Sequence, residues 1–151
     1  MKEVQPIRDT KKIDVMKSIM KGESNYRDLL LFVLGINTGL RISDILALKW
    51  SSFKNGGGRL LKVGDQLNVV EIKTKKIKSF MINRSVAEAL KLYHDSLANV
   101  NPDDPVFSSR KTDDGSLQPI TRIAAWQMLN RYANMVGLDD GIGTQDRKSV
   151  V

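Results

Sequence analysis

The N-terminal third of the chain carries hydrophobic residues at helical spacing. Three of them recur every three or four positions behind the candidate capping residues at 9 and 10: Ile13, Met16 and Met20. We therefore expect a first helix that ends at about residue 21, before Gly22. Residues 29–34 are apolar without interruption, so a helix over residues 24–37 would be hydrophobic on nearly every side and buried.

A third helix is expected just after Gly39, a residue type that often ends helices. It should begin near Arg41, and the spacing places three apolar residues on its inward face: Ile42, Ile45 and Leu46. The same spacing places Asp44 and Lys49 on the outward face. Three helices are thus expected before any strand.

Between residues 59 and 83 the pattern changes from helical to β. Three short segments, rich in apolar or β-branched residues and separated by Gly64-Asp65 and a basic run, are residues 60–63, 67–72 and 79–82. We expect them to form a small three-stranded antiparallel sheet. Loops are expected at 54–58, 101–105 and 111–119, where turn-forming residues cluster.

Helices are expected again over residues 85–93 and from Thr121 to about Met135. In the second of these, five residues suggest an inward stripe: Ile123, Trp126, Leu129, Ala133 and Val136. Trp126 is therefore expected in the core rather than on a base-stacking surface. The resulting fold class is α+β, mainly α, with a small three-stranded antiparallel sheet in a single domain over residues 1–151.

Composition and charge narrow the partners. The chain has 151 residues, a net charge of +7 and a pI near 9.7, which are typical of a protein that meets a polyanion such as nucleic acid, although a basic surface without a partner has the same signature. The absence of cysteine excludes disulfides, thiolate metal sites and a cysteine nucleophile. No apolar run approaches the length of a membrane span, and we expect a cytoplasmic protein.

Arg41 is the first candidate for chemistry, because it follows a helix-ending glycine and begins a new helix. The core can hold the backbone of such an arginine while its guanidinium fork projects to a phosphate and binds it with two hydrogen bonds. The alternative is a structural arginine that pairs with Asp44 or caps a carbonyl group.

The segment around Arg41, residues 38–50 (TGLRISDILALKW), closely resembles the first conserved box of tyrosine recombinases and phage integrases. The resemblance continues at residues 71–82 (EIKTKKIKSFMI), which look like the family's β-hairpin with its catalytic lysine, and at the helix that follows. It implies the family's helical catalytic domain and double-stranded DNA as the partner. It further implies site-specific strand cleavage and rejoining through a 3′-phosphotyrosine intermediate, without metal or other cofactor.

By this resemblance Arg41 would neutralise the non-bridging phosphate oxygens in the transition state. Lys73 would protonate the leaving 5′ oxygen or bind the phosphate. Lys75 or Lys76 is the match if the register slips, and a solvated hairpin lysine is the other interpretation of Lys73. Lys75, Lys76 and Lys78 are then expected to follow the DNA backbone and to add salt-dependent affinity.

Residues 119–138 are similar to the helix that precedes the family's second conserved box. On this helix Arg122 and Arg131 are candidates for DNA contact, with ordinary exposed helix cations as the alternative. Gln145 then stands where the family has a histidine. Either Arg147 or Lys148 takes the place of the second-box arginine, or the sequence leaves the family pattern after Thr144.

The remaining chemistry of the family has no match in the sequence. His94 is the only histidine and is expected to be solvated or satisfied at the end of a surface helix, while Tyr26, Tyr93 and Tyr132 are expected in the core or at its boundary. We therefore expect an incomplete catalytic domain, without the N-terminal core-binding domain, that is monomeric and inert alone, although a full-length parent would assemble as a homo-oligomer on DNA. The alternatives are a non-catalytic DNA-binding remnant that modulates an intact integrase, and a basic helix-turn-helix regulator.

Overall fold

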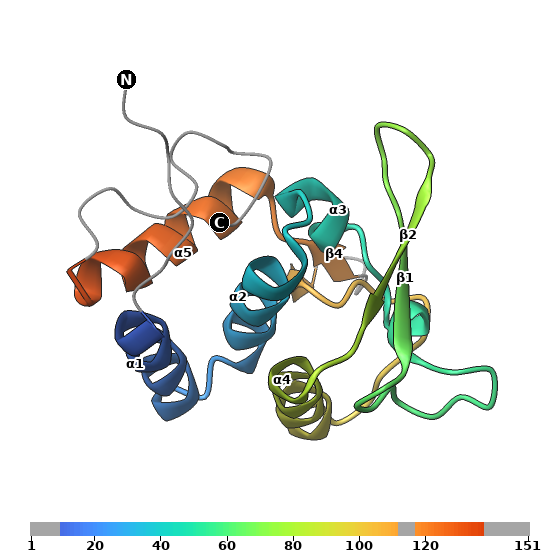
Figure 1. The fold of residues 1–151 in the computed structure, drawn as a ribbon, viewed down its shortest axis with the longest axis horizontal. Coiled ribbons are helices and arrows are strands. Elements are labelled where there is room, and N and C mark those ends of the chain that lie inside the picture. The colour runs from blue at the N-terminus through green and yellow to red at the C-terminus, as the bar shows by residue number, and fades with distance from the viewer. Residues whose placement is uncertain (1–9, 112–116, 138–151) are drawn as a thin grey trace.

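The computed structural model describes residues 10–111 and 117–137. The helices are α1 (Thr10–Gly22), α2 (Tyr26–Thr38), α3 (Ile42–Leu46), the 3₁₀ helix η1 (Trp50–Phe53), α4 (Arg84–Ser96) and α5 (Arg122–Met135). The strands are β1 (Gln66–Val70), β2 (Ile77–Met81), β3 (Ser108–Lys111) and β4 (Leu117–Pro119). The expected class, α+β and mainly α, is confirmed (Figure 1).

Helix α2 is the centre of the molecule (Figure 1). Every residue from 29 to 34 is at most 1% exposed, because α1, α3, α4 and α5 all contact this helix. A helix that is apolar on all sides needs such a surround to leave water, and burial of its large side chains is a main source of stability. The sequence prediction of a buried second helix is therefore confirmed.

The ends of the helices follow local rules. Gly39 adopts the left-handed conformation, with φ of 67°, and its N–H donates to the carbonyl of Gly35, so α2 ends where the sequence predicted. The side chain of Asn83 accepts a hydrogen bond from the Val86 N–H at the start of α4. Thr121 caps α5 in the same way, through the N–H of Ala124.

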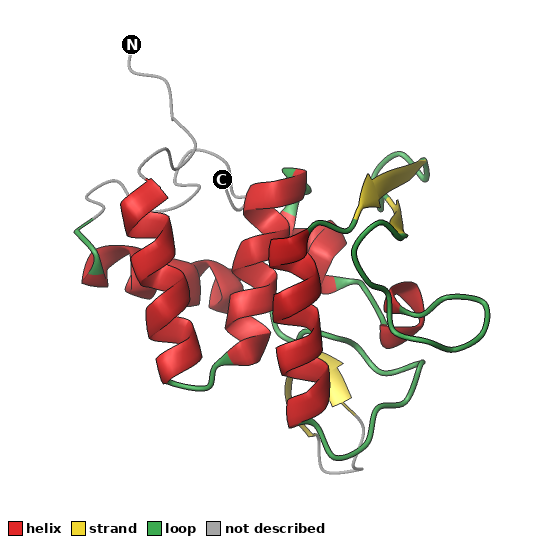
Figure 2. Cartoon of the chain, turned by 60° about the horizontal axis from the view of Figure 1, so that its bottom comes forward, coloured by secondary structure: helices red, strands yellow, loops and turns green. Residues whose placement is uncertain are grey.

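The strands form two separate pairs among the described residues, rather than one three-stranded sheet (Figure 2). Strands β1 and β2 pair in antiparallel register, with Val69 opposite Lys78. The third expected strand, residues 60–63, forms no ladder: Leu61 donates to the Phe53 carbonyl, and Leu60 makes a single bridge to Lys54. The three-strand expectation is thus corrected, because this segment is hydrogen-bonded to the end of η1.

The second strand pair lies where a loop was expected. Strands β3 and β4 pair in antiparallel order between Ser108 and Pro119, with an irregularity in their register. The segment between them, residues 112–116, lies outside the described residues. Of the predicted loop at 111–119, at least its two ends are therefore extended and paired.

The inward stripe expected on α5 is confirmed at Leu129 and Ala133, which are buried, and corrected at Ile123 and Trp126. Ile123 is 67% exposed and Trp126 is only half-buried, so neither belongs to the buried core. The buried residues of α5 recur at spacings of four, three and one: Ala125, Leu129, Tyr132 and Ala133. This face packs toward α1, α2 and α3, which α5 contacts. None of the helices in the described part of the chain is both long and apolar enough to cross a bilayer.

Candidate nucleic-acid interface

Arg41 lies at the junction between α2 and α3, where the backbone is firmly held. Its neighbours Leu40 and Ile42 are buried in the core. Its own carbonyl accepts hydrogen bonds from the N–H groups of Asp44 and Ile45, at 3.0 and 3.1 Å. The side chain of Arg41 is half-buried, so the core fixes its base while its guanidinium reaches the surface. An arginine in this position is well placed to meet a phosphate.

Asp44 faces inward, contrary to the expectation from helical spacing. It is 3% exposed, and its Oδ1 accepts a hydrogen bond from the backbone N–H of Ile72 at 2.9 Å. This bond ties α3 to the hairpin turn that follows β1. Among the described residues Asp44 forms no ion pair with Arg41, and its Oδ2 has no hydrogen-bond partner. The ion pair with Asp44, one of the structural roles considered for Arg41, is therefore not seen.

The tip of the β1–β2 hairpin carries the predicted lysines. The turn is closed by two backbone hydrogen bonds of 2.8 Å, from Glu71 N–H to the Lys76 carbonyl and from Lys75 N–H to the Glu71 carbonyl. Lys73, Lys75 and Lys76 are all exposed in or beside this turn. Lys73 thus lies in the turn itself, beyond the last paired residue of β1. The structure presents three cations together at one end of the molecule.

One face of the hairpin turns toward the core and toward α3. Leu67 and Val69 on β1 are buried, and the alternation of strand residues places Glu71 on the same face. Lys78, opposite Val69, also points to this face. Its Nζ lies 3.4 Å from Oε2 of Glu71. A carboxylate therefore lies within the group of cations.

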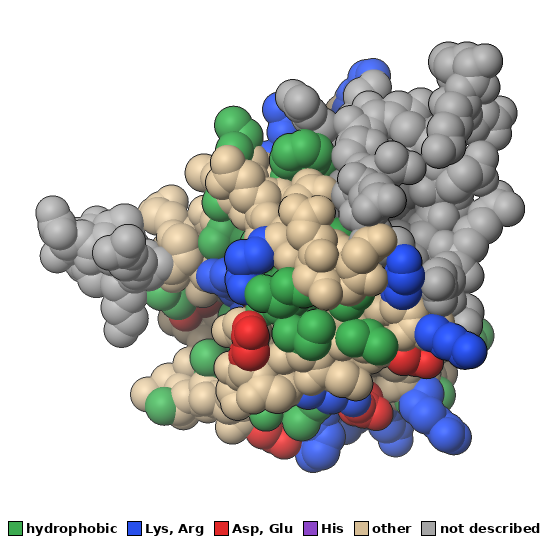
Figure 3. Space-filling model, turned by 90° about the vertical axis from the view of Figure 1, so that its left-hand side faces the viewer, with side chains coloured by type: hydrophobic (Ala, Val, Ile, Leu, Met, Phe, Trp, Pro, Cys, Tyr) green, Lys and Arg blue, Asp and Glu red, His purple; other side chains and the backbone are tan. Residues whose placement is uncertain are grey.

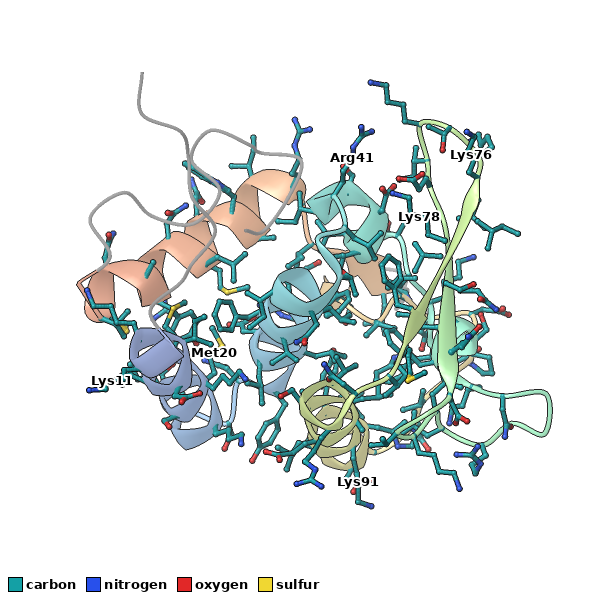
Figure 4. The ribbon with its side chains drawn as sticks, viewed as in Figure 1. Lys11, Met20, Arg41, Lys76, Lys78 and Lys91 are labelled. Atoms are coloured by element: carbon teal, nitrogen blue, oxygen red, sulfur yellow. The ribbon has the colours of Figure 1, made fainter. Side chains whose placement is uncertain are left out.

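The pKa of the Glu71 carboxyl is held below its usual value. The largest cause is the hydrogen bond from the Thr74 hydroxyl, at 3.0 Å, and further causes are Lys78 and the positive charge of Arg41. Figure 4 shows Arg41, Lys76 and Lys78 on the same side of the molecule, with Lys91 on the opposite side.

The two arginines of α5 lie on opposite sides of the helix. Arg122 begins the helix, is exposed, and lies at the end of α5 nearest α3 (Figure 1). Arg131 is nine residues further on, which at about 100° per residue places it on the other side. Its guanidinium lies 4.5 Å from the ring centroid of Tyr132. The structure therefore brings Arg122, and not Arg131, toward the side of Arg41.

The cationic residues of the opposite flank are more dispersed. On the face seen in Figure 3, to which α1 belongs, Lys and Arg side chains alternate with acidic and hydrophobic ones. Lys21 on α1, for example, is paired with Glu88 on α4.

We name the group formed by Arg41, Lys73, Lys75, Lys76, Lys78 and Arg122 the hairpin cation group.

The three tyrosines are held away from Arg41. The Tyr93 hydroxyl donates to the Val106 carbonyl at 2.7 Å, and the Tyr132 hydroxyl donates to Glu23 at 3.0 Å. Tyr26 begins α2, the helix at whose far end Arg41 lies, about 20 Å away along the axis. His94, half-buried, contacts the Trp50 ring and lies 3.2 Å from the Lys54 amine. The expected core or boundary places of the three tyrosines are confirmed, and His94, on α4, has a partner, as one of its expected alternatives held.

Two site features escaped the sequence prediction, and one set of residues cannot be compared. Asp44 was expected outside, and Glu71 was not singled out, although its alternation with Leu67 and Val69 was a signal for the inner face. Arg147, Gln145 and Lys148 lie outside the described residues. Within the described part of the chain no group of three or more His, Cys, Asp or Glu residues is arranged to hold a metal ion.

Comparison with known proteins agrees with this geometry. Residues 9–147 match the model of the phage integrase family. A probable integrase/recombinase, YoeC of Bacillus subtilis (strain 168), is 36% identical over 141 residues, which are 93% of this chain and 68% of that protein. The match spans both the Arg41 segment and the lysine hairpin. The chain therefore belongs to the phage integrase family.

Proposed function

We propose that this chain supplies the phosphate-binding part of a tyrosine recombinase active site and holds double-stranded DNA against the hairpin cation group. The observation that carries the proposal is the common placement of Arg41 and the hairpin lysines beside one another, on elements that Asp44 joins by its hydrogen bond to Ile72. Such a cluster suits a nucleic-acid backbone, because cationic side chains bind phosphate oxygens by charge-assisted hydrogen bonds.

Within this site each residue has a distinct role. Arg41 binds the two non-bridging oxygens of the scissile phosphate with its guanidinium fork and stabilises their charge in the transition state. Lys73 protonates the 5′ oxygen as it leaves, which an exposed amine at a turn can do once it meets the DNA. Lys75, Lys76 and Arg122 contact neighbouring phosphates and orient the duplex.

We propose that the nucleophile comes from outside these 151 residues. Their three tyrosines are the only ones in the sequence, and the hydroxyls of Tyr93 and Tyr132 are engaged inside the fold. We therefore propose that these residues bind DNA without cleaving it alone, and that strand cleavage through a phosphotyrosine needs a tyrosine supplied by another segment or subunit. The same observation supports the second candidate, a DNA-binding modulator of an intact integrase.

Binding is tested with a fluorescent duplex of about 30 base pairs at low salt, where non-specific phosphate contacts are strongest. Replacing Lys73, Lys75 and Lys76 with alanine should weaken binding at least about tenfold, since three phosphate contacts are lost. The matched control replaces three cations of the pocket between α4 and residues 59–63, namely Arg59, Lys62 and Lys91. Both variants lose the same charge, so equal effects would reject the hairpin as the DNA-binding element.

Cleavage is tested by incubation with a nicked duplex that traps covalent protein–DNA complexes. We expect no denaturant-resistant complex from these 151 residues. A complex that forms, and that disappears when Tyr26 is replaced with phenylalanine, would show that the chain carries its own nucleophile. That result would contradict the proposed division of the active site.

A further inference from the structure

Glu71 is the one acidic residue set among the cations of the hairpin, and its surroundings are specific. Its side chain is only 12% exposed, although the neighbouring lysines of the turn are open to solvent. One carboxylate oxygen accepts the hydrogen bond of the Thr74 hydroxyl at 3.0 Å. The other lies 3.4 Å from the Nζ of Lys78. Both oxygens are therefore engaged, and the carboxylate has a fixed place.

The position of Glu71 follows from the alternation of side chains along the strand and from the hydrogen bonds of its backbone. It lies on the face of the hairpin that turns toward α3, together with Lys78. Its backbone N–H and carbonyl are both used to close the turn. Arg41 is near enough for its charge to contribute to the lowered pKa of the Glu71 carboxyl. The carboxylate is thus ionised at neutral pH and lies among the cations that would meet a phosphate.

We propose that Glu71 is an internal counter-ion that competes with DNA phosphate for Lys78, and so keeps the affinity of the site for arbitrary DNA low. This inference rests on the proposed function. In the free protein Glu71 neutralises Lys78. When a duplex docks, Lys78 stays paired with Glu71 and is not available to a phosphate, and the negative charge of Glu71 repels the DNA backbone. Only a duplex that makes further contacts offsets this repulsion.

The proposal differs from a purely structural role in the sign of its prediction. If Glu71 only supported the hairpin, its removal would loosen the turn and weaken binding. A glutamine keeps an oxygen that accepts the Thr74 hydrogen bond and has nearly the same shape, so Glu71→Gln removes the charge while leaving the turn in place. Tighter binding of this variant is the signature of a competing counter-ion.

The experiment measures the affinity of the 151-residue chain for a fluorescent duplex of unrelated sequence over a series of salt concentrations. Glu71→Gln should bind about three- to fivefold more tightly than the unchanged chain, the range expected for loss of one charge interaction near the surface. The slope of log affinity against log salt should steepen by about 0.9, because Lys78 gains one phosphate without losing a protein partner.

Glu88→Gln is the matched control. It removes the same charge from another ion pair, that of Glu88 with Lys21 between α4 and α1, away from the hairpin. It should change affinity only by the small effect of net charge. In a Lys78→Met background, Glu71→Gln should lose most of its effect, since the residue that Glu71 neutralises is gone.

Each outcome decides the proposal. The proposal is overturned if Glu71→Gln and Glu88→Gln change the affinity equally. It is also overturned if Glu71→Gln binds more weakly than the unchanged chain, whatever its melting temperature. In both cases Glu71 is a structural residue. If neither the unchanged chain nor Glu71→Gln binds duplex at low salt, the proposed function itself fails. If the unchanged chain binds and Glu71→Gln does not differ from it, the counter-ion inference alone fails.

Discussion

The two neighbours of Arg41 in the chain, Leu40 and Ile42, are buried and hold its backbone in place. Substitutions of the Arg41 side chain should therefore affect DNA binding more than folding. We expect Arg41→Ala to weaken duplex binding by about tenfold or more, because a charge-assisted hydrogen bond to phosphate is lost. The affinity of Arg41→Lys should lie between those of the unchanged chain and Arg41→Ala, because lysine keeps the charge and loses the guanidinium fork. Lys91→Ala, on the opposite side, is the control in a fluorescence anisotropy titration. An Arg41→Ala affinity equal to that of Lys91→Ala would exclude Arg41 from the interface.

Asp44 joins the Arg41 helix to the hairpin, and its loss should appear as a change in stability. Asp44→Ala removes the acceptor of the part-buried hydrogen bond from the Ile72 N–H, which should lower the free energy of unfolding by about 1–3 kcal/mol. Asp44→Asn keeps an acceptor oxygen and should cost less. Urea denaturation measures both. Equal losses in the two variants would show that the hydrogen bond to Ile72 does not carry the stabilisation.

Single residues also show where sequence reasoning reached its limit. Arg41 and Gly39 were placed by local rules alone, because a left-handed glycine and the start of a helix are decided within a few residues. Asp44 was not, because helix periodicity assigns a polar residue to the outward face and contains no information about a hairpin that arrives 28 residues later. Its burial is decided by the tertiary contact.

The hairpin turn places Lys75 in a conformation that lysine rarely adopts. Its φ is 61°, in the left-handed region, which costs an L-residue about 1–2 kcal/mol relative to glycine. We expect Lys75→Gly to raise the free energy of unfolding by about 1 kcal/mol while weakening DNA binding, because strain is relieved and a phosphate contact is lost. Lys75→Gly should therefore be more stable than the unchanged chain and bind DNA more weakly.

Lys76→Gly is the matched control for this prediction. Lys76 lies beside Lys75 and has no positive φ, so glycine there should lower stability by about 0.5–1 kcal/mol through the entropy of the unfolded chain. Thermal or urea unfolding of both variants checks the contrast. Lower stability in Lys75→Gly would show that the turn differs in solution.

At the level of elements, the predictions succeeded where one segment contains its own signal. The four long helices, β1 and β2 were all anticipated. The face of α5 was anticipated only at Leu129 and Ala133, because its apolar residues fit more than one stripe. Contact with α1, α2 and α3 selected the stripe that also holds Ala125 and Tyr132. Residues 60–63 have strand composition, but hydrogen bonds to η1 took the place of a ladder.

Two tyrosines on different helices make the stability of the whole fold depend on pH. Burial raises the pKa of both Tyr93 and Tyr132, so their neutral forms are favoured in the folded state. An unfolded tyrosine ionises near pH 10, so the stability from these groups is fully present below pH 10 and is lost as pH rises above it. In urea unfolding between about pH 9 and 11, the Tyr93→Phe/Tyr132→Phe variant should lose less stability than the unchanged chain. Equal slopes would contradict this.

For the molecule as a whole, charge and family resemblance carried the prediction furthest. The net charge of +7 indicated a polyanionic partner, and the Arg41 segment and the hairpin indicated the family that the comparisons then showed. Neither distinguished Arg122 from Arg131, and neither singled out Glu71. The three-dimensional structure adds that Arg122 and Arg131 point to opposite sides of α5, and that Glu71 lies within the cation group.

The salt dependence of duplex binding tests the central claim most directly. If five cations of the group each neutralise one phosphate, the slope of log affinity against log salt is about −4 to −5; the five are Arg41, Lys73, Lys75, Lys76 and Arg122. Replacement of Lys73, Lys75 and Lys76 with alanine should reduce its magnitude by about three. A slope near zero, an unchanged slope in this variant, or no binding at low salt would contradict the assignment of this surface to DNA.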